Sequence, residues 1–338
     1  MERMRVGIIG CGYWGPNLIR NFIDLPNSDV VMVADLKKDR LTKIKSANPQ
    51  VLVTEDYKDL FDQKLDAVVV STPPATHYAI TKECFQHSLH ALVEKPLTLD
   101  STQAEELCEL AEDKHLILMV GHTFEYNDAV HALKDLIDKG ELGKILYLDS
   151  ARLNLGLFSK DLNVIWDLAP HDISILLHIL GKLPVAVSAQ GTDCIFKGIH
   201  DVAYIAMLFD DNIMAHVHVS WLDPCKVRRV TVVGSKKMAV YNDIETLQKI
   251  KIYDKGVTAP EYTDNFGDFQ FSYRYGDIFI PTIHFREPLK IECQHFLECI
   301  ENHTKPRSSG EVGMRVVKVL EAAQKSLVNS GQLETLKW

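Results

Sequence analysis

A G-x-G-x-x-G run lies near the start of the chain, at Gly10-Cys11-Gly12-Tyr13-Trp14-Gly15. It follows a short apolar run and precedes a predicted helix that begins at Pro16. In that context Gly10 allows a tight turn, Gly12 lets a diphosphate approach the backbone, and Gly15 lets helix and strand pack closely. The positive end of the helix would hold the diphosphate. The run therefore predicts a dinucleotide site formed by all six residues, and the alternative is a glycine-rich turn that binds no cofactor.

Asp35 follows the second apolar run, Val30 to Ala34, and stands 20 residues after Gly15. A carboxylate at this place accepts hydrogen bonds from the ribose diol of the adenosine and repels a 2′-phosphate. We therefore expect NAD to bind better than NADP. Lys37 and Lys38 weaken that expectation, because they could neutralise a phosphate.

Two polar segments follow two later apolar runs. Residues 71–77 read Ser-Thr-Pro-Pro-Ala-Thr-His after residues 68–70, and residues 94–96 read Glu-Lys-Pro after residues 91–93. The carboxyl ends of parallel strands face the ligand crevice in a doubly wound sheet, so both segments are expected to contact the cofactor. The residues predicted to do so are Ser71, Thr72, Pro73, His77, Glu94 and Lys95. For Lys95 the alternative is an ordinary exposed lysine.

Asp167 and His171 are four residues apart in a predicted helix over 166–180, so they share one face and could perform acid–base chemistry. The alternative is that Asp167 caps the helix and His171 is a core residue. Pro170 is expected to be tolerated only if the helix is just beginning there. Asp172 and His178 are predicted to be structural.

Four motifs, in this order, make the sequence similar to a known family, the glucose–fructose oxidoreductase / inositol dehydrogenase / MocA (Gfo/Idh/MocA) family. They are G-x-G-x-x-G at 10–15, Thr-Pro-x-x-x-His at 72–77, Glu-Lys-Pro at 94–96 and Asp-x-x-x-His at 167–171. The resemblance covers essentially the whole chain. It implies an NAD(P)-dependent sugar or cyclitol oxidoreductase with a Rossmann domain and a C-terminal domain built on an open-faced sheet, which commonly forms the dimer or tetramer contact.

The resemblance also implies roles for individual residues. Lys95 matches the family's catalytic lysine, and Asp167 and His171 match the acidic and histidine members of its site. Many members have glycines in the Asp-x-x-x-His segment, whereas residues 163–172 here lack them. Residues 163–172, together with residues 152–156 and 220–224, are similar to the corresponding segments of family members that modify nucleotide sugars for surface polysaccharides.

The first 121 residues alternate apolar runs with helical patterns, which predicts an α/β domain with a doubly wound parallel sheet. The expected strands are Arg5–Ile9, Val30–Ala34, Ala67–Ser71, Ala91–Glu94 and Leu116–Gly121. Closely spaced strand patterns between residues 185 and 253 then indicate a mostly antiparallel sheet. We therefore predict a Rossmann domain over 1–122 and an α+β domain for substrate binding and oligomerisation over 123–338.

Residues 201–209 do not alternate between apolar and polar, which suggests that both faces of this strand are covered. Helices of the same domain could cover one face and a partner subunit the other, giving a homodimer or homotetramer. The alternative is that the same chain covers both. Residues 254–285 contain eight aromatic residues and are expected to form an ordered arm or a lid.

Composition excludes several classes of protein. The chain of 338 residues carries a net charge of −9, which argues against a nucleic-acid binder. No run approaches the roughly 20 apolar residues that a membrane-spanning helix needs. The seven cysteines are scattered without a CxxC pair, so neither a disulfide framework nor a metal site is expected. These features predict a reduced, cytoplasmic protein.

The chemistry that fits these residues is oxidation of a secondary alcohol. His171 is the best general base, Asp167 could orient it or bind a neighbouring hydroxyl, and Lys95 could stabilise the alkoxide or relay a proton. Which of Lys95 and His171 accepts the proton first stays open. The residues expected to contact substrate are Tyr126, Asn127, Arg152, Asn154 and Asn163.

The substrate expected from the resemblance is a nucleotide-activated hexose, UDP-N-acetylglucosamine or its uronate first, oxidised at C3 to a keto sugar for surface polysaccharide or lipid A synthesis. The alternatives are a dehydrogenase of a free sugar or inositol, an NAD-dependent glycosidase, and a sugar-sensing regulator without turnover. The presence of Lys95, Asp167 and His171 argues against the regulator.

Overall fold

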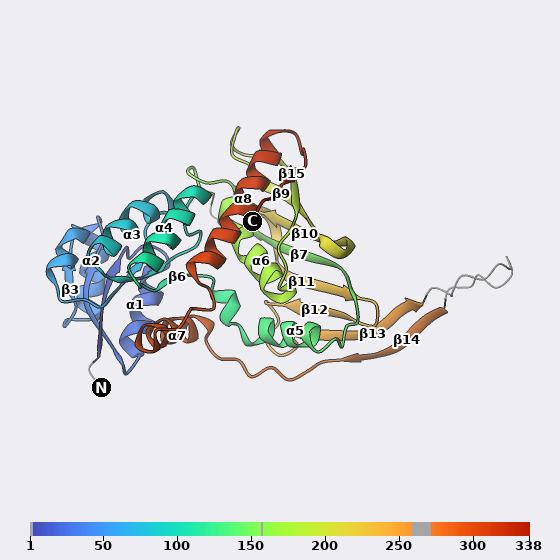
Figure 1. The fold of residues 1–338 in the computed structure, drawn as a ribbon, viewed down its shortest axis with the longest axis horizontal. Helices are drawn as coiled ribbons and strands as arrows, with labels where there is room; N and C mark the ends of the chain where they lie inside the picture. Colours follow the sequence, from blue (N-terminus) through green and yellow to red (C-terminus); the bar gives the residue numbers. More distant parts are fainter. Residues whose placement is uncertain (1–2, 157, 259–271) are drawn as a thin grey trace. The chain divides into compact units, whose positions relative to one another are not determined.

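The computed structural model describes residues 3–156, 158–258 and 272–338. Contacts within the chain divide it into two compact units. Unit 1 comprises residues 1–126 and 286–321, and unit 2 comprises residues 127–285 and 322–338. Each unit is built around its own sheet (Figure 1).

Unit 1 contains a six-stranded sheet in the order β3-β2-β1-β4-β5-β6, with every neighbouring pair parallel. Its strands are β1 (Met4–Ile9), β2 (Ser28–Ala34), β3 (Leu52–Thr54), β4 (Ala67–Val70), β5 (His90–Val93) and β6 (Leu118–Val120). Its helices are α1 (Gly15–Asp24), α2 (Lys38–Ala47), α3 (His77–Gln86), α4 (Ser101–Asp113) and α7 (Pro288–Asn302), with the short 3-10 helices η1 (Tyr57–Asp62), η2 (Pro74–Thr76) and η3 (Thr123–Tyr126). The doubly wound parallel sheet is confirmed; β3 and α2 are additions to the predicted elements.

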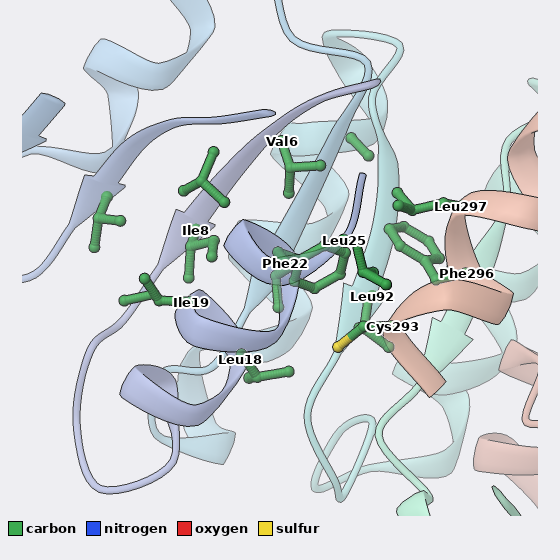
Figure 2. Packing of buried hydrophobic residues seen from close by; sticks show 14 of the residues in the cluster. Val6, Ile8, Leu18, Ile19, Phe22, Leu25, Leu92, Cys293, Phe296 and Leu297 are labelled. Atoms are coloured by element: carbon green, nitrogen blue, oxygen red, sulfur yellow. The ribbon is translucent and has the colours of Figure 1, made fainter. Parts of the chain in front are cut away.

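The core of unit 1 joins elements that are far apart in the sequence. Phe22 of α1 packs edge-on against Phe296 of α7, with ring centroids 6.4 Å apart (Figure 2). Cys293 and Leu297 of α7 lie in the same cluster. Residues 286–321 therefore group with unit 1, although the predicted division assigned them to the second domain. The sequence shows that α7 has an apolar face, but it does not show that this face packs on α1.

Unit 2 contains a nine-stranded sheet in the order β14-β13-β12-β11-β7-β10-β9-β8-β15. Only the β7–β10 pair among these described strands is parallel, so the mostly antiparallel sheet is confirmed. Its strands are β7 (Ile145–Leu155), β8 (Ala186–Thr192), β9 (Val202–Phe209), β10 (Ile213–Ser220), β11 (Leu222–Gly234), β12 (Met238–Asn242), β13 (Ile250–Thr258), β14 (Ser272–Phe279) and β15 (Glu334–Thr335). Its helices are α5 (Asp128–Asp138), α6 (Val164–Leu180) and the 3-10 helix η4 (Asp210–Asn212), and α8 (Gly310–Val328) continues into it from unit 1.

Two segments of unit 2 add to the sequence expectation. β7, the strand between β10 and β11, was not predicted. Residues 254–285, expected to form an arm or lid, include the end of β13 and all of β14, which pair at one end of the sheet. Residues 259–271 of that segment lie outside the described residues.

The two faces of β9 have different environments. Ala203, Ile205 and Met207 are buried, on the face where α6 packs against β9 and β10 (Figure 1). On the other face the Tyr204 side chain is 44% exposed and stacks on His218 of β10, with ring centroids 4.0 Å apart. The apolar character of both faces thus reflects one covered face and one face that is open in the single chain.

Candidate active site

The glycine turn between β1 and α1 forms a close-packed cradle. Gly10 has a φ of +97°, and a Cβ atom on it would lie 2.6 Å from the carbonyl oxygen of Ser71. A Cβ atom on Gly15 would lie 2.4 Å from the carbonyl oxygen of Gly10. A Cβ atom on Gly12 would meet nothing nearer than the Arg40 guanidinium, 3.5 Å away. The backbone at Gly12 is therefore open to the approach of a ligand. Because α1 begins at Gly15, this turn fits the diphosphate of a dinucleotide.

Asp35, after β2, is held by the same turn. Its carboxylate accepts hydrogen bonds of 2.8 Å from the backbone N–H groups of Cys11 and Lys37. Arg40 of α2 forms an ion pair of 3.3 Å with it. Burial raises the pKa of Asp35, but the hydrogen bonds and Arg40 outweigh burial and leave that pKa lowered. The ionised carboxylate fits the ribose of a dinucleotide. Arg40 escaped the sequence analysis because α2 was not predicted.

His77 connects the two polar segments that follow β4 and β5. Its Nε2 lies 2.8 Å from the carbonyl oxygen of Thr72, and its Nδ1 lies 2.9 Å from that of Pro96. The imidazole is fully buried, and burial lowers its pKa. His77 therefore holds the two turns together, and its direct contact with a cofactor stays a prediction. Nearby, the Ser71 hydroxyl donates a 2.7 Å hydrogen bond to the carbonyl of Gly10.

Glu94 and Lys95 follow β5, and the Lys95–Pro96 peptide is cis. The Glu94 carboxylate accepts a 3.2 Å hydrogen bond from the backbone N–H of Lys95. Burial raises the pKa of Glu94 to about 7, against the opposing effect of the Lys95 charge. A Cβ atom on Gly121 would lie 2.9 Å from the same carboxylate, so a larger residue there would displace the end of the Glu94 side chain.

The α6 helix positions Asp167 and His171. Its N-cap is Asn163, whose side-chain oxygen accepts hydrogen bonds from the N–H groups of Ile165 and Trp166 at 3.1 and 3.3 Å. Asp167 is therefore not the cap. Pro170 lies inside the helix, contrary to the expectation that the helix would begin beside it. Asp167 and His171 are half-buried, whereas most of the helix is fully buried.

Trp221 orients Asp167. The indole Nε1–H donates a 3.0 Å hydrogen bond to Oδ2 of Asp167. Trp221 is 1% exposed and packs on Phe158, with ring centroids 5.6 Å apart. A Cβ atom on Gly156 would lie 2.8 Å from the indole. Residues 220–224, which contain Trp221, were noted only for their likeness to family members, because residues 54 positions apart give no local signal of contact.

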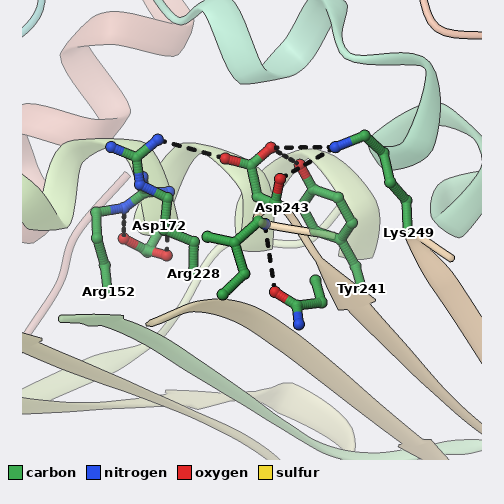
Figure 3. A network of polar contacts seen from close by, with 8 residues as sticks. Arg152, Asp172, Arg228, Tyr241, Asp243 and Lys249 are labelled. Atoms are coloured by element: carbon green, nitrogen blue, oxygen red, sulfur yellow. Dashed lines mark hydrogen bonds and ion pairs between the residues drawn. The ribbon is translucent and has the colours of Figure 1, made fainter. Parts of the chain in front are cut away.

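Arg152, a predicted substrate contact, lies in a buried ion pair. Its Nε donates a 2.6 Å hydrogen bond to Asp172, which also accepts one of 2.6 Å from the Ser150 hydroxyl (Figure 3). Both charged side chains are nearly inaccessible to solvent. These contacts agree with the structural role predicted for Asp172, which stays a prediction. A second polar group lies beside this pair and centres on Asp243 (Figure 3). It contains Arg228, Tyr241, Asp243 and Lys249.

The other predicted substrate contacts also have local roles. The Tyr126 hydroxyl is buried in unit 1, 3.1 Å from both Ser308 Oγ and His295 Nδ1. Asn127 caps α5 by accepting a 2.9 Å hydrogen bond from the N–H of Ala129. Asn154 is half-buried on β7. Contact of these residues, Arg152 and Asn163 with substrate stays a prediction.

No cluster of three or more potential metal-ligating side chains occurs among the described residues. All seven cysteines are free thiols. Within the described ranges, no helix combines the length and apolar character that crossing a bilayer requires.

Two family models match the chain. One, described as "Oxidoreductase family, NAD-binding Rossmann fold", matches residues 4–122, and the other, "GFO/IDH/MocA C-terminal domain", matches residues 130–240. The chain is 27% identical over 327 residues to the UDP-N-acetylglucosamine 3-dehydrogenase of Acidithiobacillus ferrooxidans, with 94% of this chain and 95% of that protein covered.

A second relative is the myo-inositol 2-dehydrogenase of Thermotoga maritima, 24% identical over 339 residues, with 96% of each chain covered. The solved structure of the Acidithiobacillus enzyme superimposes with a TM-score of 0.81 at 24% identity, covering 97% of this chain and 98% of that one. This last likeness is one of fold.

Proposed function

Because this chain is an NAD-binding oxidoreductase of the Gfo/Idh/MocA family, we propose that it oxidises a ring hydroxyl of a nucleotide-activated hexose. UDP-N-acetylglucosamine or its uronate, oxidised at C3, is the first candidate, and the product would be a keto sugar for surface polysaccharide or lipid A synthesis. The main support for the proposal is that one chain contains both the glycine turn at residues 10–15, which fits a dinucleotide, and the helix α6, which carries Asp167 and His171. The full-length similarity to a UDP-N-acetylglucosamine 3-dehydrogenase supports the choice of substrate.

The residues divide the work between binding and proton transfer. The glycine turn and Asp35 bind the dinucleotide, which when bound accepts a hydride from the carbon being oxidised. Lys95 supplies a positive charge for the oxygen that loses its proton. His171 accepts that proton or passes it on. The hydrogen bond from Trp221 holds the Asp167 carboxylate in one orientation, in which it can accept a hydrogen bond. Either Lys95 or His171 is the first proton acceptor.

A polyol such as inositol is the second candidate substrate. The myo-inositol 2-dehydrogenase relative supports it over a similar length of chain. Both substrates present a secondary ring alcohol to the same acid–base groups, so the difference between them lies in what binds the rest of the molecule.

The decisive experiment measures binding and turnover with the purified chain. Melting temperatures are measured with NAD and a panel of nucleotide sugars, free hexoses and inositols, since a ligand that binds only the folded state stabilises it by about 2.7 kcal/mol at 100 times its Kd. We expect a UDP-hexosamine to raise the melting temperature most and to reduce NAD, with the keto product identified by mass and NMR. Turnover of inositol without turnover of any nucleotide sugar would overturn the proposed substrate.

We also propose a cytoplasmic homodimer or homotetramer that associates through the open face of the nine-stranded sheet. Tyr204, Met214 and Tyr147 are large apolar or aromatic side chains, and each is more than 40% exposed. The seven free thiols favour a reducing compartment. Tyr204→Asp should release monomers on a sizing column. Met207 is buried on the opposite face, so its replacement should unfold the chain rather than dissociate it. A wild-type monomer at micromolar concentration would exclude the association.

A further inference from the structure

Glu292 of α7 is a carboxyl group that folding has removed from water. It is 0% exposed. Its Oε2 accepts a 2.8 Å hydrogen bond from the Thr123 hydroxyl, and its Oε1 has no hydrogen-bond partner among the described residues. Among the described residues, the charged groups that act on its pKa are the carboxyl groups of Glu94 and Glu125, and both raise it. An ionised carboxylate in such surroundings is costly, so the protonated acid is the favoured form.

Glu94 contacts the same short turn of the chain. Its carboxylate packs against Gly121, where a Cβ atom would lie 2.9 Å away. Thr123, which binds Glu292, comes two residues later. Residues 121–123 therefore connect the two carboxyl groups. Burial is the main cause that raises the pKa of Glu292 well above its ordinary value, and the charge of Glu94 is the next.

The groups around the two acids do not neutralise a second negative charge. His122 lies between Gly121 and Thr123 and is 1% exposed; burial, assisted by the Lys95 charge, lowers its pKa to about 3. Glu125 acts on the pKa of Glu292 in the same direction as Glu94, and burial raises the pKa of the Cys293 thiol well above its ordinary value. The positive charge of Lys95 lowers the pKa of Glu94, against the effect of burial. The Trp14 side chain lowers the same pKa to a smaller extent.

We propose that Glu94, which is half-buried, and Glu292, which is fully buried, form a coupled acid pair that carries one proton at pH 7.5, with Glu292 as the protonated member, and that Glu94 is a positioning residue for Lys95. The pair then places a single negative charge, that of Glu94, beside the lysine. A second charge would compete for the same ammonium group and raise the cost of burial. The pair is a property of unit 1, whereas its effect on turnover rests on the proposed role of Lys95.

The first test measures the protonated acid directly and needs no substrate. The infrared C=O stretching band of a protonated buried carboxylic acid is recorded at pH 7.5 in wild type, in Glu292→Gln and in the matched control Glu301→Gln. Glu301 is exposed on the same helix. We expect the band in wild type and in the control, and its loss in Glu292→Gln. A band that is unchanged in Glu292→Gln would overturn the proposal.

The second test asks whether the two acids are coupled. Titration of the Glu292 band should move to lower pH in Glu94→Gln, because the neighbouring negative charge is removed. It should move to higher pH in Thr123→Val, which removes the hydroxyl that stabilises the carboxylate. Titrations that coincide in all three proteins would show two independent acids and overturn the pair.

The third test connects the pair to Lys95. If the proposal holds, the pH profile of kcat/KM in wild type contains a rise near neutral pH that Glu94→Gln abolishes, with a loss of about tenfold or more above pH 7.5. A profile in Glu94→Gln that matches wild type would overturn the positioning role. Absence of turnover with every nucleotide sugar, together with the expected infrared titrations, would instead reject the proposed substrate and leave the pair in place.

Discussion

Lys95 and Asp167 have neighbours of different kinds. Lys95 follows a strand of the parallel sheet and lies beside Glu94, whose pKa burial raises to about 7. Asp167 lies on α6 and accepts a hydrogen bond from the neutral indole of Trp221. Both are half-buried in the chain. The setting of Lys95 therefore depends on the protonation state of nearby acids, whereas that of Asp167 depends on the placement of one packed ring.

This difference indicates two ways to prepare a polar group for chemistry. Buried carboxyl groups give a strong field, but their charge changes with pH near neutrality. A packed neutral donor gives a weaker interaction that does not titrate.

Lys95→Ala, Asp167→Asn and His171→Ala should each lower turnover by about 100- to 10,000-fold, because each removes a group that transfers a proton or stabilises charge. NADH binding, measured by fluorescence titration, should be nearly unchanged. Lys114→Ala, an exposed lysine after α4, is the control for loss of a positive charge. Near-wild-type turnover in both Lys95→Ala and His171→Ala would refute the assignment of both groups.

Arg152→Met should destabilise the fold by about 3–5 kcal/mol, because it leaves the carboxylate of Asp172 buried without its partner. Urea unfolding measures the loss. If Arg152 instead contacts substrate, the variant should keep its stability and raise KM. The two outcomes separate the structural pair from the binding role that the sequence analysis assigned to this arginine.

Glu94→Gln should change how stability depends on pH. The pKa of Glu94 is raised from an ordinary value of 4.5 to about 7, so the folded protein binds the proton more tightly than the unfolded chain. The protonated Glu94 therefore adds at most about 3 kcal/mol to the free energy of unfolding. This stabilisation is fully present below pH 4.5 and is lost as the pH rises through 7. Glu94→Gln should lack this fall, and Glu301→Gln should retain it. Identical pH profiles from urea unfolding of wild type and Glu94→Gln would contradict the expectation.

Trp221→Phe should have the smallest effect, a loss of about three- to tenfold in turnover, because one neutral hydrogen bond to Asp167 disappears. The loss should shrink when Asp167 is already Ala, since that background has no side-chain acceptor for the indole N–H. Trp338→Phe removes a different indole donor, which binds the carbonyl of Pro184, and serves as the control. A loss of the same size in both backgrounds would mean that packing, not the hydrogen bond, is responsible.

Local patterns predicted the elements that carry the cofactor. The runs Val6–Ile9, Ala67–Val70 and Ala91–Val93 are buried on both faces, and an unbroken apolar run is the direct consequence of that burial. The glycine motif was equally readable, because Gly10 and Gly15 serve contacts within a strand–turn–helix unit. α6 was predicted close to its observed bounds, since its apolar residues recur with the helical period.

The sequence alone did not determine which distant elements meet. The apolar face of α7 was visible, but its burial against α1, and with it the position of Glu292, depends on the folded unit. Likewise Trp221 meets Asp167, and Arg152 meets Asp172, across 54 and 20 residues of sequence. Periodicity records that a side chain is buried, because burial selects residue type at each position. The partner of a buried charge or donor is fixed only when separate elements pack, and the tertiary structure therefore decided the environment of the candidate catalytic groups.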